Sequence, residues 1–197
     1  MNKIKPDMKD IIIRPCKLCW IVGHCKNEPG AFHETVGYEF DYNLEIASGL
    51  TDLGDVFTFE PGNISFNNNY KYVIQKSMVP KTKDYDIGIE LHFNSYSKEA
   101  NGVEAWYWDG NEKGYKIASK YCSLMAKEFG SINRGPKAIK HDGQRGYWTF
   151  ALQKPTIVLL EPFFCTGREN IKFDEPHEKI QYQNVLRKLA EYIQTEL

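Results

Sequence analysis

Short apolar runs alternate along the chain with longer segments in which apolar residues recur at helical spacing. The apolar runs predict buried strands at residues 18–22, 56–59, 86–93, 102–108 and 156–160. The helical patterns predict helices at residues 38–53, 113–129 and 178–197, and Gly54 is the expected end of the first helix. This alternation predicts one α/β domain, in which helices cover both faces of a twisted, mostly parallel sheet of about six strands.

Other segments are less regular. Residues 25–37 are expected to form a loop, because Pro29, Gly30 and Gly37 interrupt them. Residues 72–78 fit a helix and a strand equally well. Residues 131–147 contain four glycines or prolines and are expected to form a long surface loop with one short strand at most. Residues 1–16 are expected to form an N-terminal leader or edge extension, which leaves residues 17–197 for the domain.

Composition and charge narrow the function classes. The length of 197 residues suits one domain with a sizeable core, and the net charge of −1 offers no basic field for nucleic acid or anionic lipid. No segment approaches the roughly 20 apolar residues that cross a bilayer, and no signal peptide is visible. We therefore expect a monomer that is made in the cytoplasm and neither binds nucleic acid nor inserts into a membrane.

The cysteines indicate reduced thiols. Their number, five, is odd, so a complete disulfide framework is excluded. Cys16 and Cys19 form a CxxC motif, but no second CxxC or Cys/His pair follows at a spacing that suits a structural zinc site. We expect these two thiols to be incidental.

Titratable side chains follow three of the predicted strands. His24 and His92 stand at the ends of two apolar strands, and Glu161 follows a third, while Glu39 begins the first predicted helix. Because parallel strands end at the same edge of a sheet, these side chains should converge there. Two imidazoles and one carboxylate are the protein ligands of a catalytic zinc ion with an open fourth position. The pattern predicts one zinc ion per chain, bound by His24, Glu39 and His92.

The same positions also have a structural interpretation. A single histidine at the end of a strand is more often a hydrogen-bonded structural residue than a ligand. The presence of two histidines and two carboxylates at matching positions favours the metal site. Glu28 and Cys25 compete as ligands, but a helix would hold Glu39 more rigidly than a loop holds either. Glu161 follows the most apolar run in the chain, so burial should raise its pKa unless a cation lies nearby.

Several motifs in order resemble the zinc-dependent N-acetylmuramoyl-L-alanine amidases. The first group of motifs combines a Gly-His strand end, a Gly-Ala loop and a glutamate that begins a helix: Gly23-His24, Gly30-Ala31 and Glu39. The later motifs are residues 91–95 (LHFNS), 102–107 (GVEAWY), 133–137 (NRGPK) and 155–164 (PTIVLLEPFF). The likeness covers roughly residues 17–197. The chain departs from the family pattern at Cys25, where a second glycine is common, and at Pro162.

The resemblance implies a catalytic domain that hydrolyses the amide between N-acetylmuramic acid and L-alanine in peptidoglycan. Zinc-bound water would be the nucleophile, with Glu161 as general base and then general acid. Further substrate-binding candidates are Asn94, Arg134, His141 and Arg145, although Asn94 also suits a plain turn. His33 and Glu34 are more simply solvated loop residues, and His177 is more simply part of a helix start.

The substrate lies outside the membrane, whereas no export signal and no separate wall-binding domain are visible in the chain. A phage endolysin, released when the membrane is permeabilised, fits both observations, while a tail-associated wall hydrolase and a bacterial enzyme remain open. One alternative function is a zinc peptidase or carboxypeptidase acting on wall peptides, but the HxxE and HExxH patterns are absent. The other alternative is a non-catalytic peptidoglycan-binding module, which has no use for a buried base such as Glu161.

Overall fold

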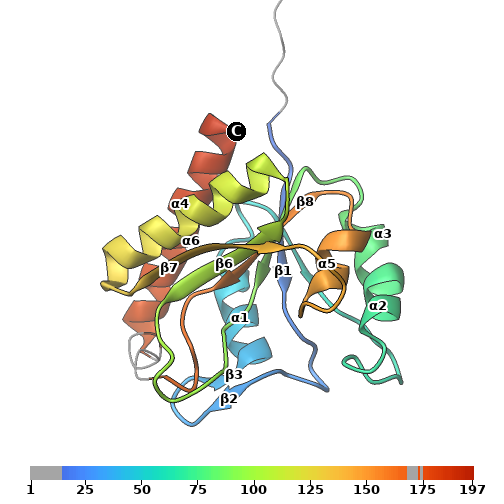
Figure 1. The fold of residues 1–197 in the computed structure, drawn as a ribbon, viewed down its shortest axis with the longest axis horizontal. Coiled ribbons are helices and arrows are strands. Elements are labelled where there is room, and N and C mark those ends of the chain that lie inside the picture. The colour runs from blue at the N-terminus through green and yellow to red at the C-terminus, as the bar shows by residue number, and fades with distance from the viewer. Residues whose placement is uncertain (1–14, 168–172, 174) are drawn as a thin grey trace, which may run out of the picture.

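A six-stranded sheet forms the middle layer of the protein, with helices on both faces (Figure 1). The computed structural model describes residues 15–167, 173 and 175–197, so nearly all of the predicted leader lies outside the described residues. The strand order is β4-β1-β5-β8-β6-β7. The strands are β1 (Leu18–Val22), β4 (Asp55–Thr58), β5 (Ile87–Leu91), β6 (Val103–Trp108), β7 (Asn133–Ile139) and β8 (Thr156–Glu161). The predicted α/β architecture is confirmed.

The sheet is parallel except at one side. Strands β4, β1, β5 and β8 run in one direction, whereas β6 lies antiparallel to β8 and β7 lies parallel to β6. The carboxyl ends of the first four strands therefore share an edge with the amino ends of β6 and β7. A separate hairpin of β2 (Phe32–His33) and β3 (Gly37–Tyr38) lies within the segment that the sequence predicts as a loop.

Each face of the sheet packs against its own group of helices. The larger core lies under α1 (Glu39–Ser48), α4 (Glu112–Phe129) and α6 (Pro176–Glu196). The smaller core lies on the other face, under α2 (Tyr70–Val73), the π-helical segment η1 (Ile74–Met78), α3 (Val79–Thr82) and α5 (Tyr147–Leu152). Residues 72–78, ambiguous in sequence, are thus helical.

The first predicted helix ends earlier than expected. Helix α1 stops at Ser48, after which the backbone N–H groups of Gly49 and Leu50 donate to carbonyls three residues back in a tightened turn. Gly54 is not the end of the helix. A Cβ at Gly54 would lie 2.4 Å from the carbonyl oxygen of Leu18, so this glycine allows the chain to pass close to β1.

The prediction of a long surface loop with one short strand at most, at residues 131–147, is right only for its second half. Seven of these residues form β7, which is the edge strand of the sheet. Pro136 suggested a loop because it cannot donate to a neighbouring strand, but an edge strand has a free side on which a proline is tolerated. Glu104 lies near the amino end of β6 and Arg134 near the amino end of β7. Because these two strands run opposite to β8, both residues lie at the edge of the sheet at which β8 ends.

Candidate metal and catalytic site

The two histidines flank the point at which the order of the strands reverses. The chain runs from β1 through α1 to β4 on one side, then crosses to β5 on the other side of β1. In open α/β sheets, ligands bind outside the carboxyl ends of the strands at such a point. His24 lies two residues beyond β1, and His92 directly follows β5. His24 has a φ of 64°, an uncommon left-handed conformation for a residue other than glycine.

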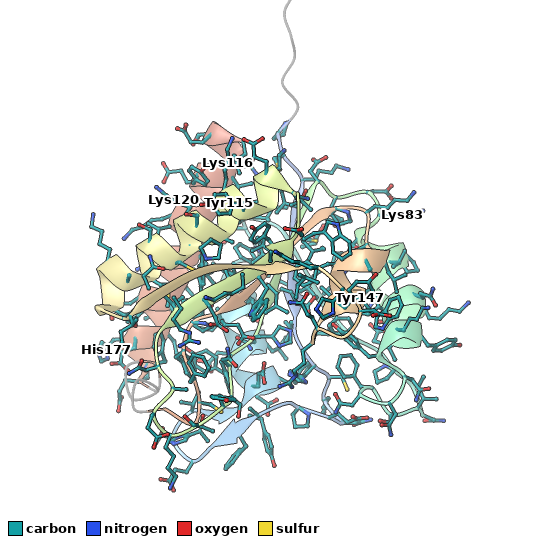
Figure 2. All side chains as sticks on the ribbon, viewed as in Figure 1. Lys83, Tyr115, Lys116, Lys120, Tyr147 and His177 are labelled. Carbon is teal, nitrogen blue, oxygen red and sulfur yellow. The ribbon has the colours of Figure 1, made fainter. Side chains whose placement is uncertain are left out.

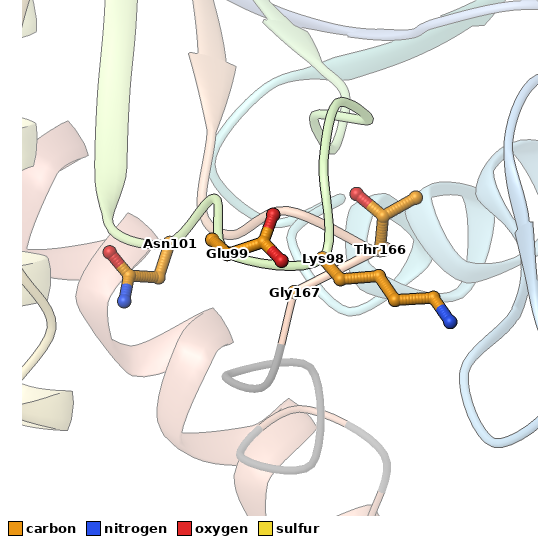
Figure 3. A pocket seen from close by; sticks show the side chains of 5 residues that line it. All are labelled: Lys98, Glu99, Asn101, Thr166 and Gly167. Carbon is orange, nitrogen blue, oxygen red and sulfur yellow. The ribbon is translucent and has the colours of Figure 1, made fainter.

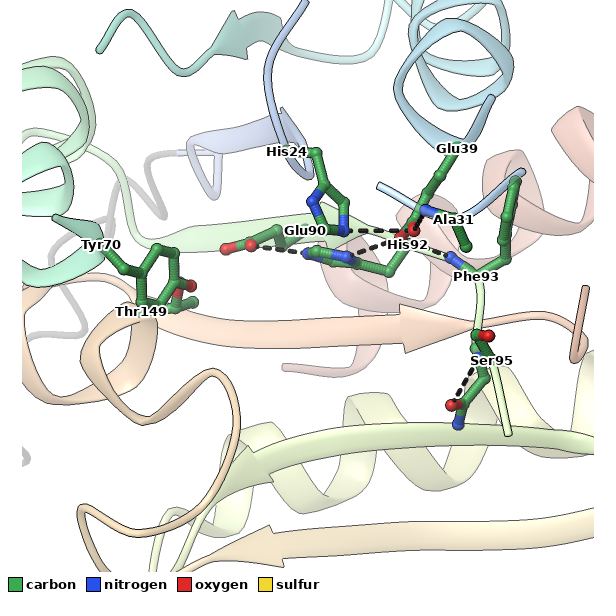
Figure 4. A network of polar contacts seen from close by, with 10 residues as sticks. His24, Ala31, Glu39, Tyr70, Glu90, His92, Phe93, Ser95 and Thr149 are labelled. Carbon is green, nitrogen blue, oxygen red and sulfur yellow. Dashed lines mark hydrogen bonds and ion pairs between the residues drawn. The ribbon is translucent and has the colours of Figure 1, made fainter. Parts of the chain in front are cut away.

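Glu39 joins the two histidines (Figure 4). It is the first residue of α1 and only 2% exposed. Its Oε2 lies 3.1 Å from Nε2 of His24, and its Oε1 lies 2.9 Å from Nδ1 of His92. The backbone N–H groups of Ala31 and Phe93 also donate to this carboxylate, at 3.0 and 3.1 Å. One donor atom from each of the three side chains lies within 4.8 Å of the others.

This arrangement keeps Glu39 ionised. Burial alone would raise the pKa of Glu39, but hydrogen bonds and charge interactions with both histidines hold it well below its usual value. Burial would lower the pKa of His92, whereas its contacts with Glu39 and Glu90 raise it well above its usual value. In the absence of a metal ion, Glu39 is therefore ionised and the ring of His92 is protonated.

Two glycines, which have no side chain, make room for His24, Glu39 and His92. A Cβ at Gly23 would lie 2.4 Å from the Cε1 and Nε2 atoms of the His92 ring. A Cβ at Gly30, where φ is +82°, would lie 2.5 Å from Oε2 of Glu39 and 2.6 Å from Cδ2 of His24. Both positions require the absence of a side chain, so the glycines of the sequence motifs act by close packing around the three polar side chains.

The donor set fits a divalent metal ion. Ligands about 2.0–2.2 Å from a tetrahedral zinc ion lie about 3.3 Å from one another, and the observed separations of 2.9 and 3.1 Å are close to this value. Nδ1 of His24 is buried and has no hydrogen-bond partner in the part of the chain that the structure describes. Among the described residues, Glu39 and Glu90 form ion pairs with imidazoles alone, so a cation at the cluster would offset their buried negative charge.

Glu161 ends β8 beside this cluster. Its Oε2 is buried and has no hydrogen-bond partner within the described part of the chain. Burial raises the pKa of Glu161 to about 8, with a further upward contribution from the charges of Glu39 and Glu104. His92 and Arg145 act in the opposite direction. A carboxyl group with a pKa near neutral and an unengaged oxygen can both accept and return a proton.

Asn94 and Arg134 meet at a carboxylate that the sequence analysis missed. Glu104, 4% exposed, accepts hydrogen bonds from Nδ2 of Asn94 and Nε of Arg134, each at 2.7 Å. The guanidinium of Arg134 also lies over the ring of Phe164, 4.9 Å from its centroid. Asn94 is thus engaged by the protein, and its Oδ1 accepts from the N–H of Ser95. The Arg134 side chain is held through its Nε and is 40% exposed.

Arg145 and His141 lie in the exposed turn that follows β7. Arg145 is near enough to Glu161 to lower its pKa, although the two residues share no ion pair. The imidazole of His141 contributes to none of the described contacts of Glu161 and the metal cluster.

The remaining candidates are not part of the cluster. Glu28 accepts hydrogen bonds from the N–H groups of Phe66 and Asn67 instead. Nδ1 of His33 pairs with Thr35 in the hairpin. His177 lies at the outer edge of the protein, at the start of α6 (Figure 2). The five cysteines form no disulfide within the described residues, and burial raises the pKa of Cys19 to about 12, which makes it an inert thiol at neutral pH.

Glu90 is the other functional candidate that the sequence analysis missed. It is 1% exposed, it is the next-to-last residue of β5, and its Oε1 lies 2.8 Å from Nε2 of His92. The signal was a charged residue inside the apolar run of residues 87–91, because a strand buried on both faces seldom carries a carboxylate. Glu104, in β6, breaks an apolar run in the same way.

A surface hollow lies beyond these residues. It is lined by Lys98, Glu99, Asn101, Thr166 and Gly167 (Figure 3). The loops after β5 and β8 that form it are joined by a bridge between Asn94 and Phe164. None of the lining side chains belongs to the group of His24, Glu39 and His92.

Within the described residues, no helix is both long and apolar enough to span a bilayer.

Comparisons with known proteins agree on one family. The sequence profile described as N-acetylmuramoyl-L-alanine amidase matches residues 19–196. The solved catalytic domain of the CD27L endolysin targeting Clostridia Difficile is 26% identical, with a TM-score of 0.66 over 90% of this chain and 96% of that chain. No curated protein sequence matches significantly.

Two more distant structures share the fold. An N-acetylmuramoyl-L-alanine amidase from Clostridium difficile 630 is 18% identical, with a TM-score of 0.69 over 93% of this chain and 100% of that chain. The amidase AmiC2 of Nostoc punctiforme is 19% identical, with a TM-score of 0.66 over 90% of this chain and 97% of that chain.

Proposed function

Because this chain belongs to the N-acetylmuramoyl-L-alanine amidase family and is therefore a peptidoglycan amidase, we propose that it works with one zinc ion held by His24, Glu39 and His92. The bond cleaved is the amide between the lactyl group of N-acetylmuramic acid and L-alanine. The observation that carries the proposal is the convergence of three donor atoms within 4.8 Å at the carboxyl edge of the sheet. The unpartnered oxygen of Glu161 beside them supplies the base.

Zinc held by His24, Glu39 and His92 would lower the pKa of a water ligand toward about 7 and would polarise the carbonyl of the scissile amide. Glu161 Oε2 accepts the proton of the attacking water and then returns it to the departing amine, which is a poor leaving group without that proton. The buried position of Glu161 suits both steps, because a pKa raised to about 8 makes it a stronger base than an exposed carboxylate and a competent acid afterwards.

Arg134 and Arg145 are the basic residues that we assign to substrate binding. Arg134 is anchored by Glu104 and Phe164 while its side chain is 40% exposed, so its guanidinium is accessible in a fixed orientation. A stem peptide carries carboxylates, which guanidinium groups bind through charge-assisted hydrogen bonds. Asn94 and His141 have weaker support, since Asn94 is engaged within the protein and His141 is exposed in the turn.

An endolysin role is the biological setting that we propose, with residues 17–197 as a monomeric catalytic domain. The likeness to an endolysin catalytic domain supports this setting. Expression in a bacterial host should leave cells intact until the membrane is permeabilised, and lysis should follow at once. A culture that does not lyse after permeabilisation would argue against this setting.

Digestion of purified peptidoglycan tests the reaction. The proposed activity releases stem peptides that begin with a free L-alanine amino group and leaves intact lactyl groups on the glycan. Other new amino termini would indicate a peptidase instead. The absence of any new end, with the protein bound to the wall, would indicate a binding module.

A further inference from the structure

The carboxylate of Glu90 contacts His92, a proposed metal ligand, at the ring nitrogen that does not face Glu39. Glu90 lies in β5, which is covered on both faces, and it is 1% exposed. Its Oε1 is 2.8 Å from Nε2 of His92, whereas its Oε2 is buried and has no hydrogen-bond partner within the described residues. A carboxylate in such a place is costly unless a cation or a donor faces it. Its only ion pair among the described residues is with His92.

His92 is held between two carboxylates, one at each ring nitrogen. Nδ1 is 2.9 Å from Glu39, and Nε2 is 2.8 Å from Glu90 (Figure 4). A neutral imidazole has one N–H donor and one nitrogen with a lone pair. A carboxylate can only accept, so in the metal-free protein each ring nitrogen carries a proton toward its carboxylate. A metal ion bound beside Glu39 and His24 would take the place of the proton on Nδ1, and Nε2 would keep its proton toward Glu90.

The hydrogen bonds at both nitrogens, together with close packing, hold the ring of His92 in this orientation. The ring lies against the backbone of Gly23, where even a Cβ would approach to 2.4 Å. On the other side of Glu90, Figure 4 shows Tyr70 and Thr149, whose hydroxyl groups bond to each other. Among the described residues, neither hydroxyl is a hydrogen-bond partner of Glu90, whose side chain bonds to His92.

We propose that Glu90 is a positioning residue that fixes the tautomer and orientation of His92, so that Nδ1 is the metal-binding nitrogen. The proposal rests on the proposed function in one respect, namely that His92 is a zinc ligand. Carboxylates that accept from the second nitrogen of a ligating histidine raise its basicity, and their loss typically weakens metal affinity about 10- to 100-fold. Glu90 does not touch substrate in this account and acts only through His92.

The test measures zinc affinity by competition with a chromophoric chelator. Glu90→Gln removes the charge at constant size and should raise the zinc Kd about 10- to 100-fold. Glu90→Asp keeps the charge but withdraws the carboxylate by one methylene, so it should weaken binding as well. Glu104→Gln is the matched control, because it neutralises another buried glutamate that contacts Asn94 and Arg134 and not His92. Its zinc Kd should stay within about twofold of the wild-type value.

Nitrogen NMR of the zinc-loaded wild-type protein adds a readout that a purely structural role would not affect. The expected spectrum has the proton of His92 on Nε2 and the metal on Nδ1. A proton on Nδ1, or a zinc Kd unchanged in both Glu90 variants, would overturn the proposal. The wild-type spectrum tests the proposed tautomer of His92 even if the variants do not fold.

His92→Ala separates this inference from the proposed function. If that variant retains zinc, the ligand set itself is wrong. If it loses zinc while both Glu90 variants bind normally, only the role of Glu90 fails.

Discussion

Glu104 and Glu161 are direct cross-strand partners in the antiparallel pair of β6 and β8. Their environments differ. Glu104 is engaged by Asn94 and Arg134, whereas Oε2 of Glu161 has no partner within the described residues. Of two neighbouring carboxyl groups, the one with a cation remains ionised more easily and disfavours ionisation of the other. The pair therefore leaves Glu161 as the group available for proton transfer.

Replacing Glu161 with Gln should abolish most of the activity without removing the metal. The amide has nearly the same size as the carboxyl group but cannot accept the proton of water, so turnover should fall by about 10²- to 10⁴-fold. Zinc content, measured by elemental analysis, should equal that of the wild-type protein. Near-normal turnover of the variant on peptidoglycan would remove Glu161 from the mechanism.

The same substitution should change how stability depends on pH in the metal-free protein. Folding raises the pKa of Glu161 from 4.5 to about 8, so the folded state binds this proton more tightly than the unfolded state. The resulting stabilisation is complete below pH 4.5 and is lost as the pH rises through about 8. Glu161→Gln cannot ionise and escapes this loss.

Urea unfolding of both proteins, in the presence of a chelator, measures the effect at pH 5, 7 and 9. The stability of Glu161→Gln relative to wild type should rise steadily over this series. A difference that is the same at all three pH values would show that Glu161 titrates normally in the folded chain.

Gly23→Ala should disturb the metal site through packing alone. The new Cβ would lie 2.4 Å from the His92 ring, so the ring must move away from Glu39 or Glu90. Zinc affinity should fall about tenfold or more. Gly114→Ala, within α4, is the control, because its Cβ would approach other atoms no closer than 3.3 Å. Equal zinc affinity in the two variants would contradict the packing argument.

Arg134 and Arg145 should both contribute to substrate binding. The double change to Gln should lower kcat/KM on a soluble muropeptide by about tenfold, mainly through KM, because it removes uniform binding of a carboxylate. Arg134→Gln leaves the buried carboxylate of Glu104 without its cation, so the melting temperature of the double variant should fall. Arg145→Gln alone removes only an exposed charge and should leave the melting temperature nearly unchanged. The Lys116→Gln, Lys120→Gln double variant is the charge-matched control, because these residues lie on α4 at the periphery (Figure 2). An unchanged kcat/KM in the arginine variant would exclude both residues from recognition.

The sequence was sufficient to predict that the strand-end histidines and the helix-start glutamate lie together, because parallel strands deliver their carboxyl ends to one edge. It was not sufficient to predict the direction of β6 and β7, since an apolar run has the same pattern in either direction. That reversal brings Glu104 and Arg134 to the site. Glu90 was also missed, although a charge in an apolar strand was visible, because its partner could be identified only from the orientation of the His92 ring.

The zinc content of the wild-type protein and of His92→Ala tests the central claim most directly. His92 contributes one of the three donor atoms, and its loss leaves one imidazole and one carboxylate, too few protein ligands to complete a catalytic zinc site. Elemental analysis after dialysis should give one zinc ion per wild-type chain and a clear loss of zinc in the variant. Full zinc occupancy in His92→Ala would contradict the assignment of the site.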